Sequence, residues 1–280
     1  RLESGKNFMR LLIVCVCLWC GVAFAARAQT EVYNQLYEAL HLNDIVDIIR
    51  TEGIEEANTT ARIYLKSRGQ TGTFSADIDN LYDSTNLSTL ILDGISSRLT
   101  EKDAEVALVF YSGVLGKNIA QLEASARLAI SDKAVEVMAI ETAKSASSKG
   151  SKRIEMLKKN MEELELVEHN MKGAFASQYG FLTRLSKAGD IKLSQDQILS
   201  MLSGSEEDLR KDVSDWIMGY SYMAYQPLID DELELYFDFL MSSSGKALNS
   251  VLFAVFNDLS VQTASALGEL IALSREARDL

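Results

Sequence analysis

The chain has 280 residues, 47% of them hydrophobic, which is enough for one large domain or two ordinary ones around a sizeable core. A net charge of −12, with no basic stripe, argues against binding to duplex DNA or RNA, because that requires clustered Lys and Arg. A single proline and a composition rich in Ala, Leu, Glu and Lys predict an all-α fold.

The first 28 residues have the pattern of a cleavable signal peptide. Basic residues precede an uncharged run at 11–25, which suits a signal-peptide core and is short for a membrane span. Small residues at Ala26 and Ala28 predict cleavage between Ala28 and Gln29, with export to the periplasm. Met9 is a candidate start of the leader, and a retained N-terminal anchor helix is the alternative. We expect no stable membrane span after cleavage.

All three cysteines lie in this leader, so the remaining chain has no thiol for a disulfide or a metal site. From there on, apolar residues recur at three- and four-residue steps, which predicts helices throughout. Thr100, followed by acidic residues, has the pattern of a helix start. The polar stretch 144–153 is either the exposed part of a long helix or a hinge between two halves.

The chain matches itself weakly at a shift of 129 residues. The segments 99–117 and 228–246 align without a gap, and each has an acidic opening, an aromatic residue near its end and a Gly-Lys pair. We therefore predict a multi-helix bundle built from a signal peptide (1–28) and two tandem, divergent helical repeats (29–147 and 148–280). Chance similarity between two amphipathic helices is the alternative. Gly116 and Gly245 are expected in a turn or kink where two helices meet, as a left-handed cap or as a site of close backbone approach.

The motif Phe110-Tyr-Ser-Gly-Val-Leu-Gly-Lys117 and its degenerate counterpart at 239–246 resemble the domain of unknown function 2059 family. The family-like segments span 99–130 and 228–259. The family often has a proline in this motif, where Val114 and Ser243 stand here. The resemblance implies an exported, helical bacterial envelope protein and no established activity.

Aromatic residues from both segments are the candidate functional feature. Packing within a helix–helix core is one interpretation, because aromatic residues dominate core burial. The other is a groove for an apolar ligand or a partner helix. The candidate groove residues are Trp216, Tyr220, Tyr236, Phe237, Phe110 and Tyr111.

No pattern in the sequence predicts catalysis. Glu165 and His169, four residues apart, are expected on one helix face, but no further histidine or cysteine accompanies them, so we expect no metal site and no cofactor. There is no Gly-x-Ser-x-Gly elbow and no phosphate-binding loop. The first hypothesis is a non-enzymatic periplasmic interaction or accessory protein whose partner is an unknown envelope protein. The alternative is a carrier of a lipid-like or other apolar small ligand in an interhelical cavity; a hydrolase is the least favoured class.

Overall fold

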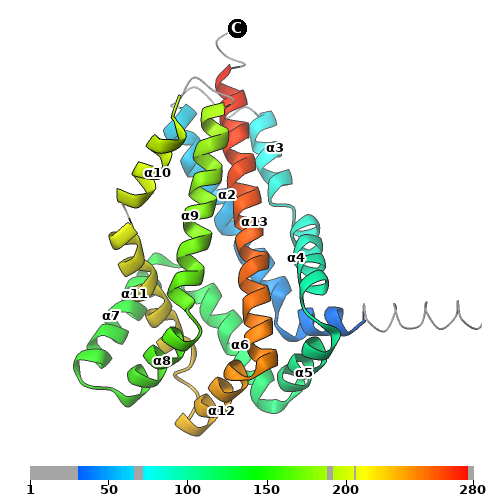
Figure 1. Cartoon of the computed structure of the whole chain (residues 1–280), viewed down its shortest axis with the longest axis vertical. Coiled ribbons are helices and arrows are strands. Elements are labelled where there is room, and N and C mark those ends of the chain that lie inside the picture. Colours follow the sequence, from blue (N-terminus) through cyan, green and yellow to red (C-terminus); the bar gives the residue numbers. More distant parts are fainter. Residues whose placement is uncertain (1–30, 66–71, 188–191, 205, 277–280) are drawn as a thin grey trace, which may run out of the picture.

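The computed structural model describes residues 31–65, 72–187, 192–204 and 206–276, and in these ranges the chain forms helices and no strands (Figure 1). The predicted all-α class is confirmed. The predicted leader, its cleavage site and Met9 lie outside the described residues.

The helices follow one another with short connections. A helix at 31–39 comes first. It is followed by α2 (Leu42–Leu65), α3 (Gly72–Leu81), α4 (Ser84–Arg98), α5 (Glu101–Ser112), α6 (Val114–Ala129), α7 (Lys133–Ser148), α8 (Lys152–Glu163), α9 (Leu166–Lys187), α10 (Gln195–Gly204), α11 (Glu206–Ala224), α12 (Asp230–Met241) and α13 (Ser243–Glu276).

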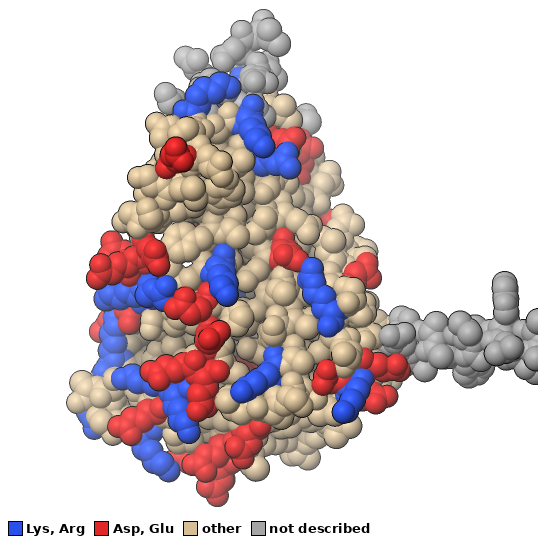
Figure 2. Space-filling model, viewed as in Figure 1, with Lys and Arg blue, Asp and Glu red and all other residues tan. Residues whose placement is uncertain are grey.

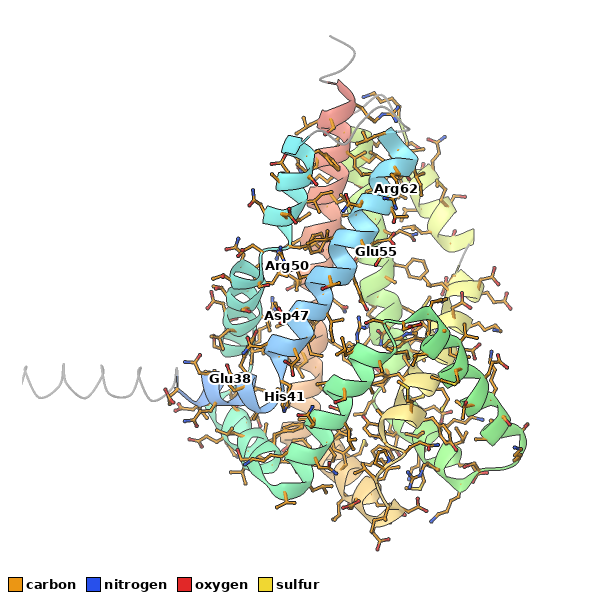
Figure 3. The ribbon with its side chains drawn as sticks, turned by 180° about the vertical axis from the view of Figure 1, so that it is seen from behind. Glu38, His41, Asp47, Arg50, Glu55 and Arg62 are labelled. Carbon is orange, nitrogen blue, oxygen red and sulfur yellow. The ribbon has the colours of Figure 1, made fainter. Side chains whose placement is uncertain are left out.

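The long helix α13 runs through the middle of the molecule, and its most extensive partner is α9 (Figure 1). The helices α4 and α5 pack along the other side of α13, and α7 packs on α11. Figure 3 shows α2 from behind, with Arg50 and other charged side chains along it; Arg50 donates to the carbonyl oxygen of Tyr82 at 2.7 Å. Within the described ranges, α13 is also long and apolar enough to cross a membrane, by length and composition only.

The main hydrophobic core draws on both halves of the chain. Ile91 and Ile119 from the first half are fully buried in it together with Leu233 from the second. A second cluster, around Ile78 and Ile271, fills the end of the bundle where α13 finishes. Because the two halves share the main core, removing either half would expose the apolar face of the other.

The polar stretch at 144–153 contains a turn. The helix α7 ends at Ser148, Gly150 adopts a φ of +68°, and α8 begins at Lys152. Arg153 then donates to the carbonyl oxygens of Tyr225 at 2.8 Å and Leu228 at 2.7 Å, which secures the connection between α11 and α12. The stretch is therefore not part of one continuous helix, and its interpretation as a hinge between two halves stays a prediction.

The two matching segments have the same local geometry. The helices α5 and α12 have 12 residues each, and their bounds are offset by 129 residues. Each is followed by one extended residue, Gly113 or Ser242, before the next helix begins. A Cβ on Gly116 would lie 2.1 Å from the carbonyl oxygen of Phe110, and a Cβ on Gly245 would lie 2.0 Å from that of Phe239. A common origin of the two segments stays a prediction.

The predicted helix start at Thr100 is confirmed. Its side-chain oxygen accepts a hydrogen bond from the backbone N–H of Asp103 at 3.2 Å, and α5 begins at the next residue. Such a cap satisfies one of the N–H groups that a helix leaves free at its start. At the start of α12 the cap differs, because Ile229 has no polar side chain and Glu232 instead accepts from the backbone N–H of Ile229 at 3.0 Å.

Candidate functional site: an interhelical cleft with a buried carboxylate

A cleft of about 400 Å³ opens within the bundle, and α2, α5, α6, α8, α9, α11, α12 and α13 all contribute to its wall. Most of the wall is apolar, with Leu157, Ile217 and Leu248 among its buried residues. Its size and apolar lining are typical of small-molecule sites in proteins.

One side of the cleft is aromatic. Trp216 and Tyr220, one turn apart on α11, stack with ring centroids 5.4 Å apart and planes 2° apart. Tyr111 from α5 and Tyr236 from α12 line the same cleft. Phe110 stacks on Phe239 behind Tyr236 and does not line the cleft; Phe237 packs at the margin of the core beside Tyr236. The structure thus brings four of the six predicted groove residues to one cleft and places the other two beside it.

Glu123 on α6 places a carboxylate among these aromatic residues. Both Tyr225 and Tyr236 donate hydrogen bonds to its Oε1 atom, each at 2.6 Å. The hydroxyl of Tyr220 donates to the backbone carbonyl oxygen of Glu123 at 3.1 Å. The Glu123 side chain is half-buried: it faces the cleft on one side, and the protein surrounds it on the others.

This environment changes the acidity of the residues involved. Burial raises the pKa of Glu123, and the hydrogen bonds from Tyr225 and Tyr236 oppose that rise without cancelling it. Burial, followed by the negative charge of Glu123, raises the pKa values of Tyr225 and Tyr236 well above 10.0, and it raises those of Tyr111 and Tyr220 for the same two reasons. The phenols therefore remain protonated donors at neutral pH.

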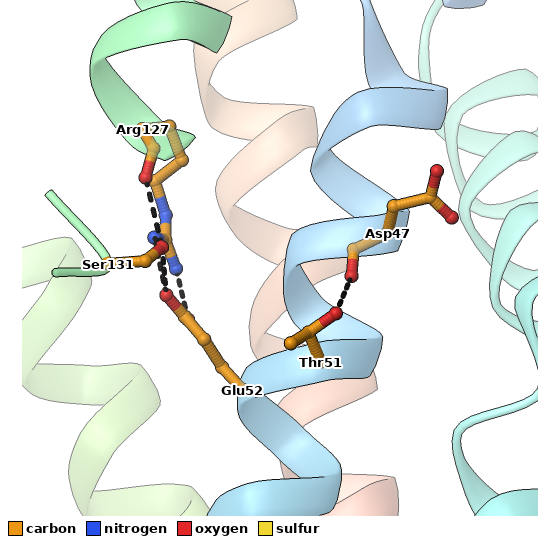
Figure 4. A network of polar contacts seen from close by, with 5 residues as sticks. All are labelled: Asp47, Thr51, Glu52, Arg127 and Ser131. Atoms are coloured by element: carbon orange, nitrogen blue, oxygen red, sulfur yellow. Dashed lines mark hydrogen bonds and ion pairs between the residues drawn. The ribbon is translucent and has the colours of Figure 1, made fainter. Parts of the chain in front are cut away.

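A cationic side chain at the cleft is already paired with a carboxylate outside it. Arg127, which lines the cleft one turn after Glu123, donates from both Nη atoms to Glu52 on α2, at 2.8 and 2.5 Å (Figure 4). Ser131 donates to the same carboxylate at 2.6 Å. Burial would raise the pKa of Glu52, but the hydrogen bonds from Arg127 and Ser131 lower it overall. The charge of Arg127 is thus compensated, and that of Glu123 has no cationic side chain bonded to it among the described residues.

Asn160 on α8 places a free hydrogen-bond donor at the same cleft. Its side chain is only 7% exposed, and its Nδ2 atom has no hydrogen-bond partner. Buried polar atoms in folded proteins nearly always have a partner, because an unsatisfied donor costs about 1–3 kcal/mol. Asn160 thus has an unsatisfied donor just beneath the wall of the cleft, which an acceptor of a bound molecule would reach after a turn of the side chain.

The sequence interpretation identified aromatic residues of the cleft and missed Glu123 and Asn160. Each stands three or four residues after a buried apolar residue of its helix, so it lies in that helix's apolar stripe. Glu123 follows the buried Ile119 by four residues, and Asn160 follows the buried Leu157 by three. A polar residue in a stripe that otherwise faces the core is the sequence signal for such a site. Their convergence on one cleft required the tertiary structure.

Glu165 and His169 do not share a helix face. The prediction that both lie on one helix face was wrong, because Glu165 has a φ of +49° in the connection between α8 and α9. The ring of His169 stacks on Phe253, with centroids 4.7 Å apart. Among the described residues, no group of three or more His, Cys, Asp or Glu side chains is placed to hold a metal ion.

A larger hollow of about 560 Å³ lies between α7, α8, α9 and α11. Its wall is more charged and includes Lys144, Lys158, Glu162 and Asp215. On the face in Figure 2, acidic and basic side chains are interspersed over the broad end of the molecule. Two of these charges, Lys144 and Asp215, pair with each other at 3.2 Å, and Lys158 donates to Ser147 at 3.1 Å, so this hollow has fewer features of a ligand site than the cleft.

Comparison with known proteins adds no relative: no family model, no curated protein and no solved structure matches the chain.

Proposed function

We propose that this protein binds a small, mostly apolar molecule in the cleft and does not transform it. The supporting observation is the combination within one apolar cleft of a carboxylate, Glu123, and an unpartnered donor, Asn160. A cleft that served only as a packing defect would have no reason to contain polar atoms that cost free energy in the absence of a ligand. This geometry favours the carrier hypothesis over the accessory-protein hypothesis that the sequence favoured first.

Several features support binding without turnover. Glu123 is the only acidic residue among the described residues that line the cleft, and no histidine lines it. Ser221 supplies a hydroxyl there, but the one carboxylate in the lining, Glu123, accepts its hydrogen bonds from Tyr225 and Tyr236. Nucleophilic catalysis needs a nucleophile and a base within hydrogen-bonding reach of each other.

The direct test uses the intrinsic fluorescence of Trp216, which lines the cleft. Titration of the purified protein with short-chain amphiphiles should shift its emission and saturate. Ser221→Leu should abolish the saturable signal because it fills the cleft. Ser214→Leu is the matched control, since Ser214 lies on the same helix and lines the charged hollow instead. Equal titration of both variants, with both folded by circular dichroism, would refute binding in the cleft.

A second candidate function is contact with a partner protein. Val109 and Val114, at the end of α5 and the start of α6, are 76% and 92% exposed, and Val106 is exposed on the same helix. Neighbouring exposed apolar residues are a feature of interaction surfaces. Val109→Glu should then reduce crosslinking to that partner without changing the signal of Trp216, whereas unchanged crosslinking would remove this support.

We also propose that the chain is exported and that it belongs with the family that its motif resembles. The leader pattern at 1–28 supports export, and the motif at 110–117 supports the family. Mass spectrometry of the protein from an envelope fraction should find Gln29 at its N-terminus. A chain that keeps Cys15, Cys17 and Cys20 would show that the leader is retained.

A further inference from the structure

We propose that the ligand of this cleft is a cationic amphiphile, with an apolar body and an amine or ammonium head that contacts Glu123 among the aromatic rings, and with a hydrogen-bond acceptor that reaches Asn160. This inference rests on the proposed function, because it specifies the chemistry of the molecule that the cleft would bind.

The charge distribution around the cleft selects the head group. The guanidinium of Arg127 is bonded to Glu52, so this pair is neutral as a unit. Glu123 receives its two hydrogen bonds from neutral phenols, both at Oε1. An anionic head would meet an uncompensated carboxylate in a low-dielectric site, whereas a cation would neutralise it.

The aromatic residues fit the same head group. Tyr225 and Tyr236 contact Glu123 directly and pack edge to face, with ring centroids 5.7 Å apart. Trp216 and Tyr220 line the same cleft as a stacked pair. Faces of Trp and Tyr attract cations within about 6 Å of the ring centroid, and aromatic rings around a carboxylate are a recurrent way of holding an ammonium group.

The donor of Asn160 supplies an independent requirement. Asn160 lies on α8 between the apolar residues Leu157 and Met161, and its Nδ2 atom is buried and unpartnered. An aliphatic chain alone would leave this donor unsatisfied. A carbonyl, ether or hydroxyl oxygen on the ligand would satisfy it, so the expected ligand has an acceptor besides its cationic head.

The test compares three probes with the same decyl chain in the purified full-length protein: decylamine, decanol and decanoate, each below its micelle concentration, by calorimetric titration at neutral pH. Decylamine should bind at least about tenfold more tightly than decanol, and decanoate should bind most weakly. Glu123→Gln keeps an acceptor for Tyr225 and Tyr236 and removes the charge. It should lower the affinity for decylamine about tenfold and leave decanol unchanged, whereas the control Glu162→Gln should change neither.

The acceptor is tested by the decyl ester of glycine, which adds a carbonyl to the ammonium head. Asn160→Leu should weaken binding of this ester and leave decylamine unchanged. Equal affinity for the amine, the alcohol and the acid, or no effect of Glu123→Gln, would overturn the proposed ligand chemistry while the cleft remained a binding site. Failure of every probe to bind would overturn the proposed function itself.

Discussion

The rings of Phe110 and Phe239 stack face to face, with centroids 3.9 Å apart and planes 3° apart. Phe110 is the tenth residue of α5, and Phe239 is the tenth residue of α12, so equivalent positions of the two matching segments contact each other. Tyr236 lies between this pair and the cleft. Its ring centroid is 6.0 Å from that of Phe110, and its hydroxyl donates a hydrogen bond to Glu123. The contact between the two segments therefore supports one wall of the cleft.

Replacement of both stacked rings by leucine should show coupling between them. Phe110→Leu and Phe239→Leu each remove the stack, so the double variant should lose less stability than the sum of the single variants. The expected coupling is about 1 kcal/mol, measured by urea unfolding in a double-mutant cycle. Effects that add within about 0.3 kcal/mol would show that the two rings do not interact.

Alanine at Gly116 or Gly245, the equivalent glycines of the two matching segments, should destabilise the fold. A Cβ at Gly116 or Gly245 would meet backbone carbonyl oxygen, which cannot move aside as a side chain can. We expect Gly245→Ala to lower the free energy of unfolding by about 3 kcal/mol, at the upper end of overpacking effects. Gly204→Ala is the matched control, because nothing lies within 4 Å of its Cβ position, and it should be neutral or slightly stabilising.

Glu123→Gln should make stability less dependent on pH. Burial raises the pKa of Glu123 above its ordinary value of 4.5, so its contribution to stability is fully present below 4.5 and is lost as the pH rises through the folded-state pKa. The melting temperature of the variant should therefore gain on that of the wild type as the pH rises from 4.5 to neutrality. The four tyrosines that face Glu123 stay protonated over this range, because their pKa values are raised: Tyr111, Tyr220, Tyr225 and Tyr236. Parallel melting curves would mean that Glu123 is ionised equally in both states.

The Arg127–Glu52 pair should have the opposite pH dependence. The pKa of Glu52 is lowered, so its contribution is present above its ordinary value of 4.5 and is lost as the pH falls through the folded-state pKa. Arg127→Gln should cost about 1 kcal/mol at neutral pH, because the pair is bidentate but still partly exposed, and less in acid. Arg98→Gln is the control, since Arg98 and Asp258 form a more exposed pair. Equal losses for the two variants would show that the bidentate geometry adds nothing.

Asn160→Leu should stabilise the protein when no ligand is bound. The change removes an unpartnered buried donor and keeps the branched shape of the side chain, and its extra volume has room beside the cleft, so the free energy of unfolding should rise by about 1 kcal/mol. Thermal unfolding of carefully delipidated protein measures this. A loss of stability would show that the amide has a partner within the protein.

The helical fold could be predicted from the sequence because its signals are local. The apolar spacing and the cap at Thr100 act within one or two turns, and they fix α5 whatever surrounds it. The breaks after Phe110 and Phe239 were expected at Gly116 and Gly245, but they lie three residues earlier, at Gly113 and Ser242. The two glycines belong to the helices that follow.

The site could be predicted only in part, because it depends on packing between distant helices. Trp216 and Tyr236 were identified as aromatic residues in apolar stripes, but the sequence does not determine which stripe faces a cleft and which faces the core. Phe110 shows this ambiguity. It stands next to Tyr111 in the same motif, but Tyr111 lines the cleft and Phe110 stacks on Phe239 behind the cleft wall. Glu123 is a candidate site residue because it accepts hydrogen bonds from Tyr225 and Tyr236, which are 102 and 113 residues away in the chain.

Native mass spectrometry of the wild-type protein, purified gently from its own envelope fraction, shows whether the cleft holds a small molecule. Ser221→Leu and Ser214→Leu are prepared in parallel. We expect an added mass of a few hundred daltons on the wild type, lost from Ser221→Leu and retained in Ser214→Leu. A wild-type protein that has no added mass, or an adduct that Ser221→Leu retains, would show that the cleft does not bind such a molecule.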